Sequence, residues 1–476
     1  MHNLADLIPG NHTANPLITA ITCDSRKVGP GTLFFALSGS KADGRAFIPQ
    51  AVAQGAVVIV AETGTQAETG TALLVTVDNP RRAYALAAAR FHGRQPEVMA
   101  AITGTNGKTS CVNFTRQMWT CLGHRAASLG TLGIIADGWP SRPSLTTPDP
   151  ADLHEALAEL AENSITHAAM EASSHGLDQF RLDGVKLQAA GFTNLTRDHL
   201  DYHGDMQAYL AAKLRLFTDL LPEDGVAVIN ADCPVAAQVA QAAGSRRVLR
   251  FGRAGAELAL KDIRPDSHGQ VLDLDVLGHS ATIRLPLAGT FQAANALAAL
   301  GLVIGCGGNA LAAINALESL TEIPGRLQKV ADKDSAPIFV DYAHTPDALE
   351  TVLTALLPHA TGRLLVVFGC GGDRDPGKRP QMGEIAARLA DIVLVTDDNP
   401  RSEDPALIRA AIMTAAKGAM EIADRRTAIR HAVSLLRQGD VLVVAGKGHE
   451  SGQIVGAHTL PFDDAEECRQ AAGGTP

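Results

Sequence analysis

The amino-acid sequence predicts an α/β fold in three domains. The chain has 476 residues, which exceeds one ordinary domain, and 46% of them are hydrophobic, which is enough for several cores. Short apolar stretches alternate with helical ones along the chain, and this alternation indicates parallel sheets with helices on both faces. We expect a small N-terminal α/β domain over residues 1–95, a central domain with a P-loop-type parallel sheet over 96–324, and a C-terminal Rossmann-like domain over 325–476.

The elements of each domain follow from the apolar runs. In the first domain the strands are "GTLFFAL", "AVVIV" and "LLVTV", and "RRAYALAAARFHG" is a closing helix. The second begins with "VMAAIT" and a helix from Thr109, and continues with "HAAMEASS", "AAGFTNLT" and "GVAVIN". The third begins near "IPGRLQKV" and contains the strands "PIFVDYAH", "RLLVVFGCGG", "DIVLVTDDNP" and "DVLVVAGKGHE".

Composition and charge narrow the class of protein. The formal net charge is 41 − 51 = −10, which argues against a dedicated nucleic-acid binder. The seven cysteines form no C-x-x-C pair, so we expect reduced thiols in a cytoplasmic protein, with neither a disulfide framework nor a zinc site. The N-terminal segment lacks the basic and apolar regions of an export signal. The uncharged stretch 285–317 includes Pro286 and a Gly-rich turn, which favours a buried helix over a membrane span.

The loop "GTNGKTS" is the strongest local signal for function. A strand ends at Thr103, and a Gly-rich turn then leads into a helix, so backbone N–H groups and the helix N-terminus together form a cradle for an anion. Lys108 is placed to reach phosphate oxygens and the Thr109 hydroxyl to bind a metal ion. The usual pattern has a glycine where Ile102 stands, which argues against ordinary P-loop kinases and motors. We favour nucleotide binding over a plain turn with a surface lysine.

Two polar groups follow in the central domain. Glu171 ends a strand, where its carboxylate can meet a metal ion beside the loop, although a lone glutamate there is usually only a charge at a helix start. The stretch "NLTRDHLDYHG" then brings two aspartates and two histidines within six residues. Clustered histidine and carboxylate side chains suit a divalent metal ion, and the alternative is a solvated polar loop. We favour a site.

Three polar clusters each follow a strand of the last domain: "GCGGDRDPGKRPQMG", "TDDNPRSEDP" and "AGKGHESGQ". The carboxyl ends of parallel strands share one edge of a sheet, so these clusters are expected to meet in one crevice. Cations, anions and an amide together suit a ligand that carries charges of both signs, whereas each cluster alone could be ordinary surface charge. The residues concerned are Arg374, Asp398, Asn399, Arg401, Gly446 and Glu450.

The form "TGTNGKT" resembles the Mur ligases, ATP-dependent amide ligases of bacterial cell-wall synthesis, and their folate-polyglutamating relatives. The motifs "EASSHGL", "DHLDYHG", "GGDRDPGKRP", "DNPR" and "GKGHE" extend the resemblance over all three domains. It implies that the γ-phosphate of ATP passes to a substrate carboxylate, and that an amine then attacks the acyl phosphate. The N-terminal stretch from Cys23 resembles the uridine-nucleotide-binding domain of the family, which the folate relatives generally lack.

The resemblance also implies the residues of the ATP and metal sites. Lys108, Glu171, His199 and Lys213 would be catalytic. Two Mg²⁺ ions would be bound by Thr109, Glu171, His199 and Lys213, and a carbamate on Lys213, derived from CO₂, would hold the second ion. Without the resemblance, Lys213 would be read as a surface residue whose stem lies along apolar neighbours. The ATP contacts would be Gly104, Thr105, Asn106, Gly107, Lys108, Thr109, Ser110, Asn295, Arg326 and Asp341.

Two further ligands are implied by the same resemblance. UDP-N-acetylmuramoyl-L-alanyl-D-glutamate would contact Cys23, Ser25, Ser40, Lys41, Ala42, Thr146, Thr147, Ser173, Gln179 and Arg181. Leu145 stands where the family has an asparagine, which leaves that contact open. Meso-2,6-diaminopimelate, with two carboxylates and two amines, would contact Arg374, Asp398, Asn399, Pro400, Arg401, Gly446 and Glu450. An arginine at position 401 matches a distal carboxylate that lysine does not have.

The expectation is therefore a monomeric, cytoplasmic, ATP- and Mg²⁺-dependent ligase of peptidoglycan precursor synthesis that acts on diaminopimelate and does not insert into membranes. Three alternatives stay open. Arg401 argues against a lysine-adding ligase, and the N-terminal domain argues against a folate-polyglutamating one. A nucleotide-binding sensor of wall precursors that does no ligation would not need Lys108, Glu171, His199 and Lys213 together.

Overall fold

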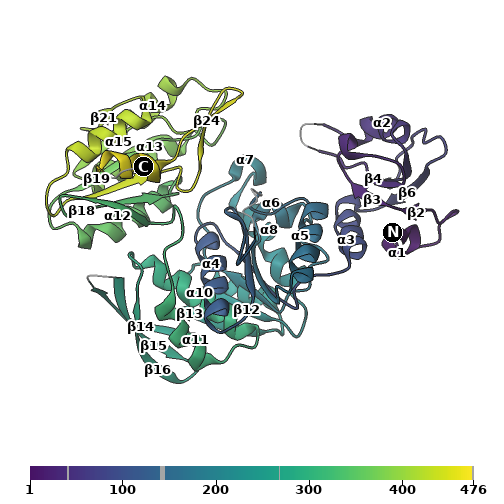
Figure 1. Ribbon diagram of the computed structural model, residues 1–476, viewed down its shortest axis with the longest axis horizontal. Helices are drawn as coiled ribbons and strands as arrows, with labels where there is room; N and C mark the ends of the chain where they lie inside the picture. Colours follow the sequence, from purple (N-terminus) through teal and green to yellow (C-terminus); the bar gives the residue numbers. More distant parts are fainter. Residues whose placement is uncertain (40–41, 140–144, 267–268, 474–476) are drawn as a thin grey trace.

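The computed structural model describes residues 1–39, 42–139, 145–266 and 269–473. Figure 1 shows three units in a row: an N-terminal unit at one end (purple), a large central unit (blue to green) and a C-terminal unit at the other end (yellow-green). Each unit contains its own sheet, as the α/β prediction requires. The exact domain boundaries 1–95, 96–324 and 325–476 stay a prediction.

The N-terminal unit is built on a parallel sheet of four strands in the order β3-β4-β5-β6. Their bounds are β3 (Ala20–Thr22), β4 (Thr32–Phe35), β5 (Ala56–Glu62) and β6 (Leu73–Val77). The predicted strands correspond to β4, β5 and β6, and the predicted closing helix to α3. Among its described residues the unit also has a short antiparallel pair of strands and three α-helices: β1 (His2–Asn3), β2 (Leu17–Ile18), α1 (Leu4–Leu7), α2 (Ile48–Ala53) and α3 (Pro80–His92).

The central unit holds a sheet of ten strands in the order β16-β15-β14-β13-β12-β11-β7-β10-β8-β9. The middle of the sheet is parallel. It comprises β7 (Val98–Thr103), β8 (Ala126–Gly130), β10 (His167–Glu171), β11 (Ala189–Phe192), β12 (Val226–Asn230) and β13 (Arg247–Gly252). The remaining strands are β9 (Gly133–Ala136), β14 (Leu258–Asp266), β15 (Gly269–Val276) and β16 (His279–Leu285).

The middle of this sheet is parallel, as the sequence predicts, and antiparallel strands extend it at both edges. β9 pairs antiparallel with β8, and β14, β15 and β16 form an antiparallel meander. Along β15 most residues alternate between buried and half-buried, which is the pattern of a strand with one face on the core and one toward solvent. The alternating "VLDLDV" was the available signal for it.

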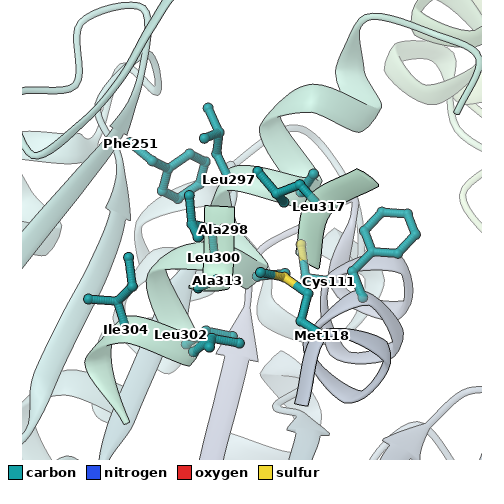
Figure 2. Close-up of a cluster of buried hydrophobic side chains, with 14 of the residues drawn as sticks. Cys111, Met118, Phe251, Leu297, Ala298, Leu300, Leu302, Ile304, Ala313 and Leu317 are labelled. Carbon is teal, nitrogen blue, oxygen red and sulfur yellow. The ribbon is translucent and has the colours of Figure 1, made fainter. Parts of the chain in front are cut away.

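Two core clusters cover the two faces of the central sheet. The first packs α10 (Phe291–Gly305) against α4 (Lys108–Cys121), and Figure 2 shows Cys111 and Met118 of α4 beside Leu297 and Leu300 of α10. The uncharged stretch predicted to be a buried helix is α10 and α11. Among the described residues, none of the helices combines the length and apolar character needed to cross a bilayer. The helices are α4 (Lys108–Cys121), α5 (Pro150–Glu162), α6 (Ser174–Asp178), α7 (Leu200–His203), α8 (Met206–Arg215), α9 (Ala236–Ala243), α10 (Phe291–Gly305) and α11 (Ala310–Ala316).

The C-terminal unit contains a six-stranded sheet in the order β17-β18-β22-β19-β20-β21, parallel except for the edge strand β17. The strands are β17 (Gln328–Lys333), β18 (Ala336–Asp341), β19 (Leu364–Phe368), β20 (Ile392–Val395), β21 (Met420–Glu421) and β22 (Val441–Ala445). The carboxyl ends of β18, β22, β19 and β20 therefore share one edge, as predicted.

Helices and a hairpin surround this last sheet. They are α12 (Pro346–Leu356), α13 (Lys378–Leu389), α14 (Pro405–Met413), α15 (Arg425–Ser434), α16 (Asp464–Ala471), β23 (Gly452–Val455) and β24 (His458–Pro461). Single helical turns occur at η1 (Ser25–Lys27), η2 (Gly44–Phe47), η3 (Leu216–Leu220), η4 (Leu317–Ser319) and η5 (Leu357–His359).

Candidate active site

The Gly-rich loop joins the central strand β7 to α4. Gly104 has a φ of +142°, and a Cβ atom there would lie 1.9 Å from Thr193 Oγ1, so only glycine fits. The loop backbone is held by the segment after β11: Thr105 N donates to Asn194 O and Asn106 N to Asn194 Oδ1, both at 2.9 Å. β7, the Gly-rich loop and α4 therefore form one fixed unit, in which the loop leads directly into the N-terminus of α4.

Two lysines meet at the carbonyl group of Gly104. Lys108 Nζ donates to the carbonyl oxygens of Gly104 (3.0 Å) and Thr105 (2.8 Å), and Lys213 Nζ donates to that of Gly104 (2.8 Å). Lys213 is only 1% exposed, so the surface reading of this residue is wrong. Burial lowers the pKa of Lys213 far below its usual value, and the neighbouring charge of Lys108 lowers that pKa further. Both causes favour the neutral form of this amine more than in a solvent-exposed lysine.

Glu171 is held at the end of β10. Its Oε1 accepts a hydrogen bond from Thr131 N (2.8 Å) and its Oε2 one from the Thr131 hydroxyl (3.3 Å). A Cβ atom on Gly130 would lie 2.1 Å from Glu171 Oε1, so the glycine leaves room for the carboxylate. The side chain is 1% exposed and lines a cavity of about 710 Å³.

His199 lies at the start of α7 with a left-handed φ of +54°. Its Nε2 is 3.4 Å from Asp198 Oδ2, and burial lowers the pKa of the imidazole to about 4. A neutral imidazole can bind a metal ion. Nearby, His203 Nε2 is 3.0 Å from Ser174 Oγ, which ties α7 to α6, and Asp201 lines a second, smaller cavity.

The predicted metal ligands Thr109, Glu171, His199 and Lys213 all line the cavity of about 710 Å³. Within the part of the chain that the structure describes, no group of three or more histidine, cysteine or acidic side chains is arranged to hold a metal ion. The hydroxyl of Thr109 and the carboxylate of Glu171 are oxygen ligands of the kind that suits Mg²⁺, which commonly takes one or two protein carboxylates and completes its shell with water and phosphate oxygens.

The predicted nucleotide contacts collect around the same cavity. Arg326 NH2 donates to Thr109 Oγ1 (2.9 Å), so the C-terminal unit reaches the first turn of α4. Asp341 is buried, with 7% of its surface exposed, and this burial raises the pKa of its carboxyl group to about 6. Its oxygens accept from the backbone N–H groups of Leu327 (2.6 Å) and Ala343 (2.7 Å). Of the predicted set, the cavity is lined by Thr105, Asn106, Gly107, Lys108, Thr109, Ser110, Asn295, Arg326 and Asp341.

Four of the residues predicted to bind the sugar peptide also line this cavity: Thr146, Thr147, Ser173 and Arg181. Thr147 Oγ1 donates to the Glu171 carbonyl oxygen and accepts from Ser173 Oγ, both at 3.0 Å. Arg181 donates to the carbonyl oxygen of Thr147 (2.8 Å) and to Gln179 Oε1 (2.7 Å). Gln179 is absent from the lining and supports Arg181 instead.

The N-terminal residues predicted to bind the same ligand are not brought to the cavity. Cys23 Sγ donates to Asp149 Oδ2 (3.5 Å), Ser25 Oγ donates to Gln50 (3.2 Å), and Ala42 is exposed at the surface. Ser40 and Lys41 lie outside the described residues. Asp149 also accepts from the Tyr84 hydroxyl at 2.6 Å, so the N-terminal unit is joined to the segment that follows Thr147.

The smaller cavity, of about 160 Å³, lies at the carboxyl edge of the C-terminal sheet. Arg401 has a φ of +53°, and its NH1 donates to the Gly372 carbonyl oxygen (2.8 Å). Asp398 is 8% exposed, and its Oδ2 is a buried atom without a hydrogen-bond partner among the described residues. The predicted residues in the lining are Arg374, Asp398, Asn399, Arg401, Gly446 and Glu450; Pro400 is not among them.

The two cavities adjoin. Both are lined by Asp198, His199, Tyr342, His344 and Arg374. The C-terminal unit is tied to the Gly-rich loop by Asp347, whose Oδ2 accepts from Asn106 Nδ2 (2.9 Å) and Thr196 Oγ1 (3.2 Å). A ligand with charges of both signs can therefore sit close to the Gly-rich loop, within reach of a group that is activated there.

Several residues of the site were missed by the sequence reasoning. Tyr342 lies in the quoted strand "PIFVDYAH" and Asp347 follows that strand, whereas Lys378 and Lys447 lie within "GGDRDPGKRP" and "GKGHE". The motifs were thus the available signal, but nothing in the sequence alone separates these positions from their neighbours. Thr131, which holds Glu171, belongs to no motif singled out in the sequence.

Known proteins share this architecture and these motifs. The family models described as "Mur ligase family, catalytic domain", "Mur ligase middle domain" and "Mur ligase, glutamate ligase domain" match residues 17–104, 102–303 and 325–448. A Rhizobium meliloti (strain 1021) protein named UDP-N-acetylmuramoyl-L-alanyl-D-glutamate–2,6-diaminopimelate ligase is 57% identical over 460 residues, 96% of this chain and 94% of the relative. The chain belongs to the Mur ligase family.

Two further comparisons extend the likeness to the Mur ligases. A protein of the same name from Caulobacter vibrioides is 54% identical over 480 residues, with 99% of each chain covered. A solved structure of a ligase of that name is 35% identical, covers 99% of this chain and 98% of its own, and superposes with a TM-score of 0.72. The three-unit α/β fold is therefore the Mur ligase fold.

Proposed function

We propose that this Mur ligase adds meso-2,6-diaminopimelate to the D-glutamyl γ-carboxylate of UDP-N-acetylmuramoyl-L-alanyl-D-glutamate, using ATP. The relatives of 54–57% identity, which cover nearly the whole chain, carry the name of this reaction. The observation that carries the proposal is the pair of adjoining cavities, one beside the Gly-rich loop and one with charged groups of both signs. We also propose that the protein is a monomer in the cytoplasm, with domain boundaries after residues 95 and 324.

The first step is phosphoryl transfer. An oxygen of the D-glutamyl γ-carboxylate forms a bond to the γ-phosphorus of ATP, and the bond from that phosphorus to the bridging oxygen breaks and releases ADP. The backbone N–H groups of the loop and Lys108 stabilise the negative charge of the phosphates, while Arg326 lies within reach of the first turn of α4. Thr146, Thr147, Ser173 and Arg181 would orient the sugar peptide so that its carboxylate faces the γ-phosphate.

The second step forms the amide. The amine of diaminopimelate attacks the acyl carbon, the tetrahedral intermediate expels phosphate, and the amine loses a proton. Arg401 would bind the distal carboxylate bidentately, and Asp398 and Glu450 the distal ammonium. The free Asp398 Oδ2 supports this assignment, because a buried carboxylate oxygen without a partner is costly unless a ligand donates to it.

The residues present also fit Mg²⁺ and a carbamate. Thr109, Glu171, His199 and a Lys213 carbamate would hold Mg²⁺, which would neutralise part of the charge that develops on the transferring phosphoryl group. For the carbamate, the neutral Lys213 amine adds to CO₂ and releases one proton. The carbamate nitrogen keeps one N–H, which can still donate to the Gly104 carbonyl oxygen.

The first experiment is phosphate release with ATP, Mg²⁺ and the UDP-sugar dipeptide, comparing meso-diaminopimelate with L-lysine. Release with diaminopimelate and not with lysine is expected, because lysine leaves Arg401 without a carboxylate. Release with lysine alone would keep the ligase and refute the role of Arg401. No release with either amino acid would refute the proposed reaction.

Replacement of Gly107 by alanine is expected to raise the KM for ATP by on the order of tenfold to a hundredfold, because it displaces the loop. Gly107 has a φ of +87°, and an added Cβ atom would lie 2.4 Å from Asn295 Oδ1 in the cavity wall. Steady-state kinetics with varied ATP measure the effect.

Gly123, just beyond the other end of α4, is the matched control. Its φ is also +87°, but apart from the adjacent residues of the chain the described part of the protein places no heavy atom within 4 Å of the added Cβ. Gly123→Ala should lower the free energy of unfolding by about 1–2 kcal/mol and leave the KM for ATP unchanged. Equal effects of the two variants on that KM would show that backbone strain alone, and not the contact with Asn295, matters at Gly107.

A further inference from the structure

Behind the smaller cavity lies a buried cation that none of the roles above uses. The Lys447 side chain is 0% exposed and is not part of the cavity lining. Its Nζ donates to Asn399 Oδ1 and to Glu450 Oε2, both at 3.0 Å. Burying an ammonium group is expensive unless anions and acceptors surround it, so this placement needs a reason.

Lys447 helps to fix the orientation of Asn399. Asn399 Oδ1 accepts from both Lys447 Nζ and the Ile454 backbone N–H (2.9 Å), which leaves its amide group to donate. Asn399 Nδ2 then donates to Glu450 Oε2 at 2.8 Å. Asn399 is only 3% exposed, so water does not compete for its amide group. The oxygen and the nitrogen of this amide therefore cannot exchange places without breaking the hydrogen bonds of the network.

The consequence falls on Glu450. Its Oε2 accepts from two donors, Lys447 and Asn399, whereas the described residues give Oε1 no hydrogen-bond partner. The Glu450 side chain is 31% exposed and lines the smaller cavity together with Asp398, whose Oδ2 is also without a partner. The network therefore presents one fixed carboxylate oxygen to the cavity.

We propose that Lys447 is a positioning residue. It holds Asn399 and Glu450 so that Glu450 binds the distal ammonium group of the amino-acid substrate. This inference rests on the proposed function and deepens it, because it assigns the specificity of the same cavity to a residue that does not touch the substrate. Lys447 also offsets part of the charge of Glu450, so that the cavity accepts a zwitterionic end and not a free cation alone.

Lys447→Met tests the proposal, because methionine retains the length of the buried stem and removes the charge. We expect the KM for meso-diaminopimelate to rise on the order of tenfold, with the KM for ATP and for the UDP-sugar dipeptide within about twofold of wild type. Lys447→Gln, which retains one donor, should lie between. Lys417→Met, the same change at an exposed lysine of the same unit, should leave all three KM values unchanged. A rise shared by all three KM values would overturn the proposal.

A double-mutant cycle separates positioning from a purely structural role. In a Glu450→Gln background, Lys447→Met should change the KM for diaminopimelate by less than about twofold, because the group that it positions is gone. The same tenfold rise in both backgrounds would mean that Lys447 acts through packing, and the proposal would fall.

Failure of the proposed function would look different. In that case the wild-type protein would release phosphate with lysine and not with diaminopimelate. The same variants, assayed with lysine, would then test Lys447, since lysine also has a distal ammonium group. No release with either amino acid would overturn both proposals together.

Discussion

Lys213→Ala is expected to lose nearly all ligase activity, on the order of a hundredfold to a thousandfold in kcat. The reason lies in the surroundings of the amine. Lys213 is 1% exposed, its Nζ donates to the same Gly104 carbonyl as Lys108, and burial depresses its pKa. A neutral amine beside the Gly-rich loop can add CO₂, and the resulting carbamate would supply oxygen ligands for Mg²⁺ where the acyl phosphate forms.

Chemical rescue makes this test specific. Formate or acetate should restore part of the activity of Lys213→Ala, because a small carboxylate can replace the carbamate oxygens in the space that alanine leaves. The same salts should not improve Lys261→Ala, a matched change at an exposed lysine on β14 of the central unit. Unchanged turnover in Lys213→Ala would remove the carbamate from the mechanism, and loss without rescue, together with a lowered Tm, would assign Lys213 a structural role.

The parts of the site that the sequence predicts are those with a local cause. The Gly-rich loop requires glycines at positions 104 and 107 because of their backbone angles and close contacts, and such requirements are visible in the sequence. Glu171 is found at a strand end because the strand is a short apolar run. The meeting of three polar clusters at one sheet edge follows from parallel pairing, which the strand–helix alternation already indicates.

The parts that the sequence does not predict depend on contacts between distant segments. The bond between Asn106 and Asp347, 241 positions apart, joins two units, and no local pattern specifies such a contact. Lys213 lies in a stretch with the spacing of an amphipathic helix. The sequence does not show which lysines of such a helix are buried, because that depends on what the helix packs against. The buried network of Lys447 has the same origin, since Asn399 lies 48 positions away.

Arg401→Ala is expected to raise the KM for meso-diaminopimelate by on the order of a hundredfold while changing that for ATP by less than about threefold. Arg401 lines the smaller cavity and not the larger one, so its loss affects the amino acid first. Its NH1 donates to the Gly372 carbonyl, which orients the guanidinium plane before a ligand arrives. The remaining N–H groups can then form the two parallel bonds that a carboxylate accepts.

A second variant at position 401 and a control at another arginine show whether Arg401 binds the distal carboxylate through paired hydrogen bonds or merely supplies charge. Arg401→Lys retains the charge but not the planar pair of donors, so it should restore little of the affinity for diaminopimelate. Arg388→Ala removes an arginine from an exposed pair with Glu350 in the same unit and should change neither KM. If Arg401→Ala raised the KM for ATP and diaminopimelate equally, the arginine would act on the arrangement of the units, because a residue that only binds the amino acid cannot alter the affinity for both substrates alike.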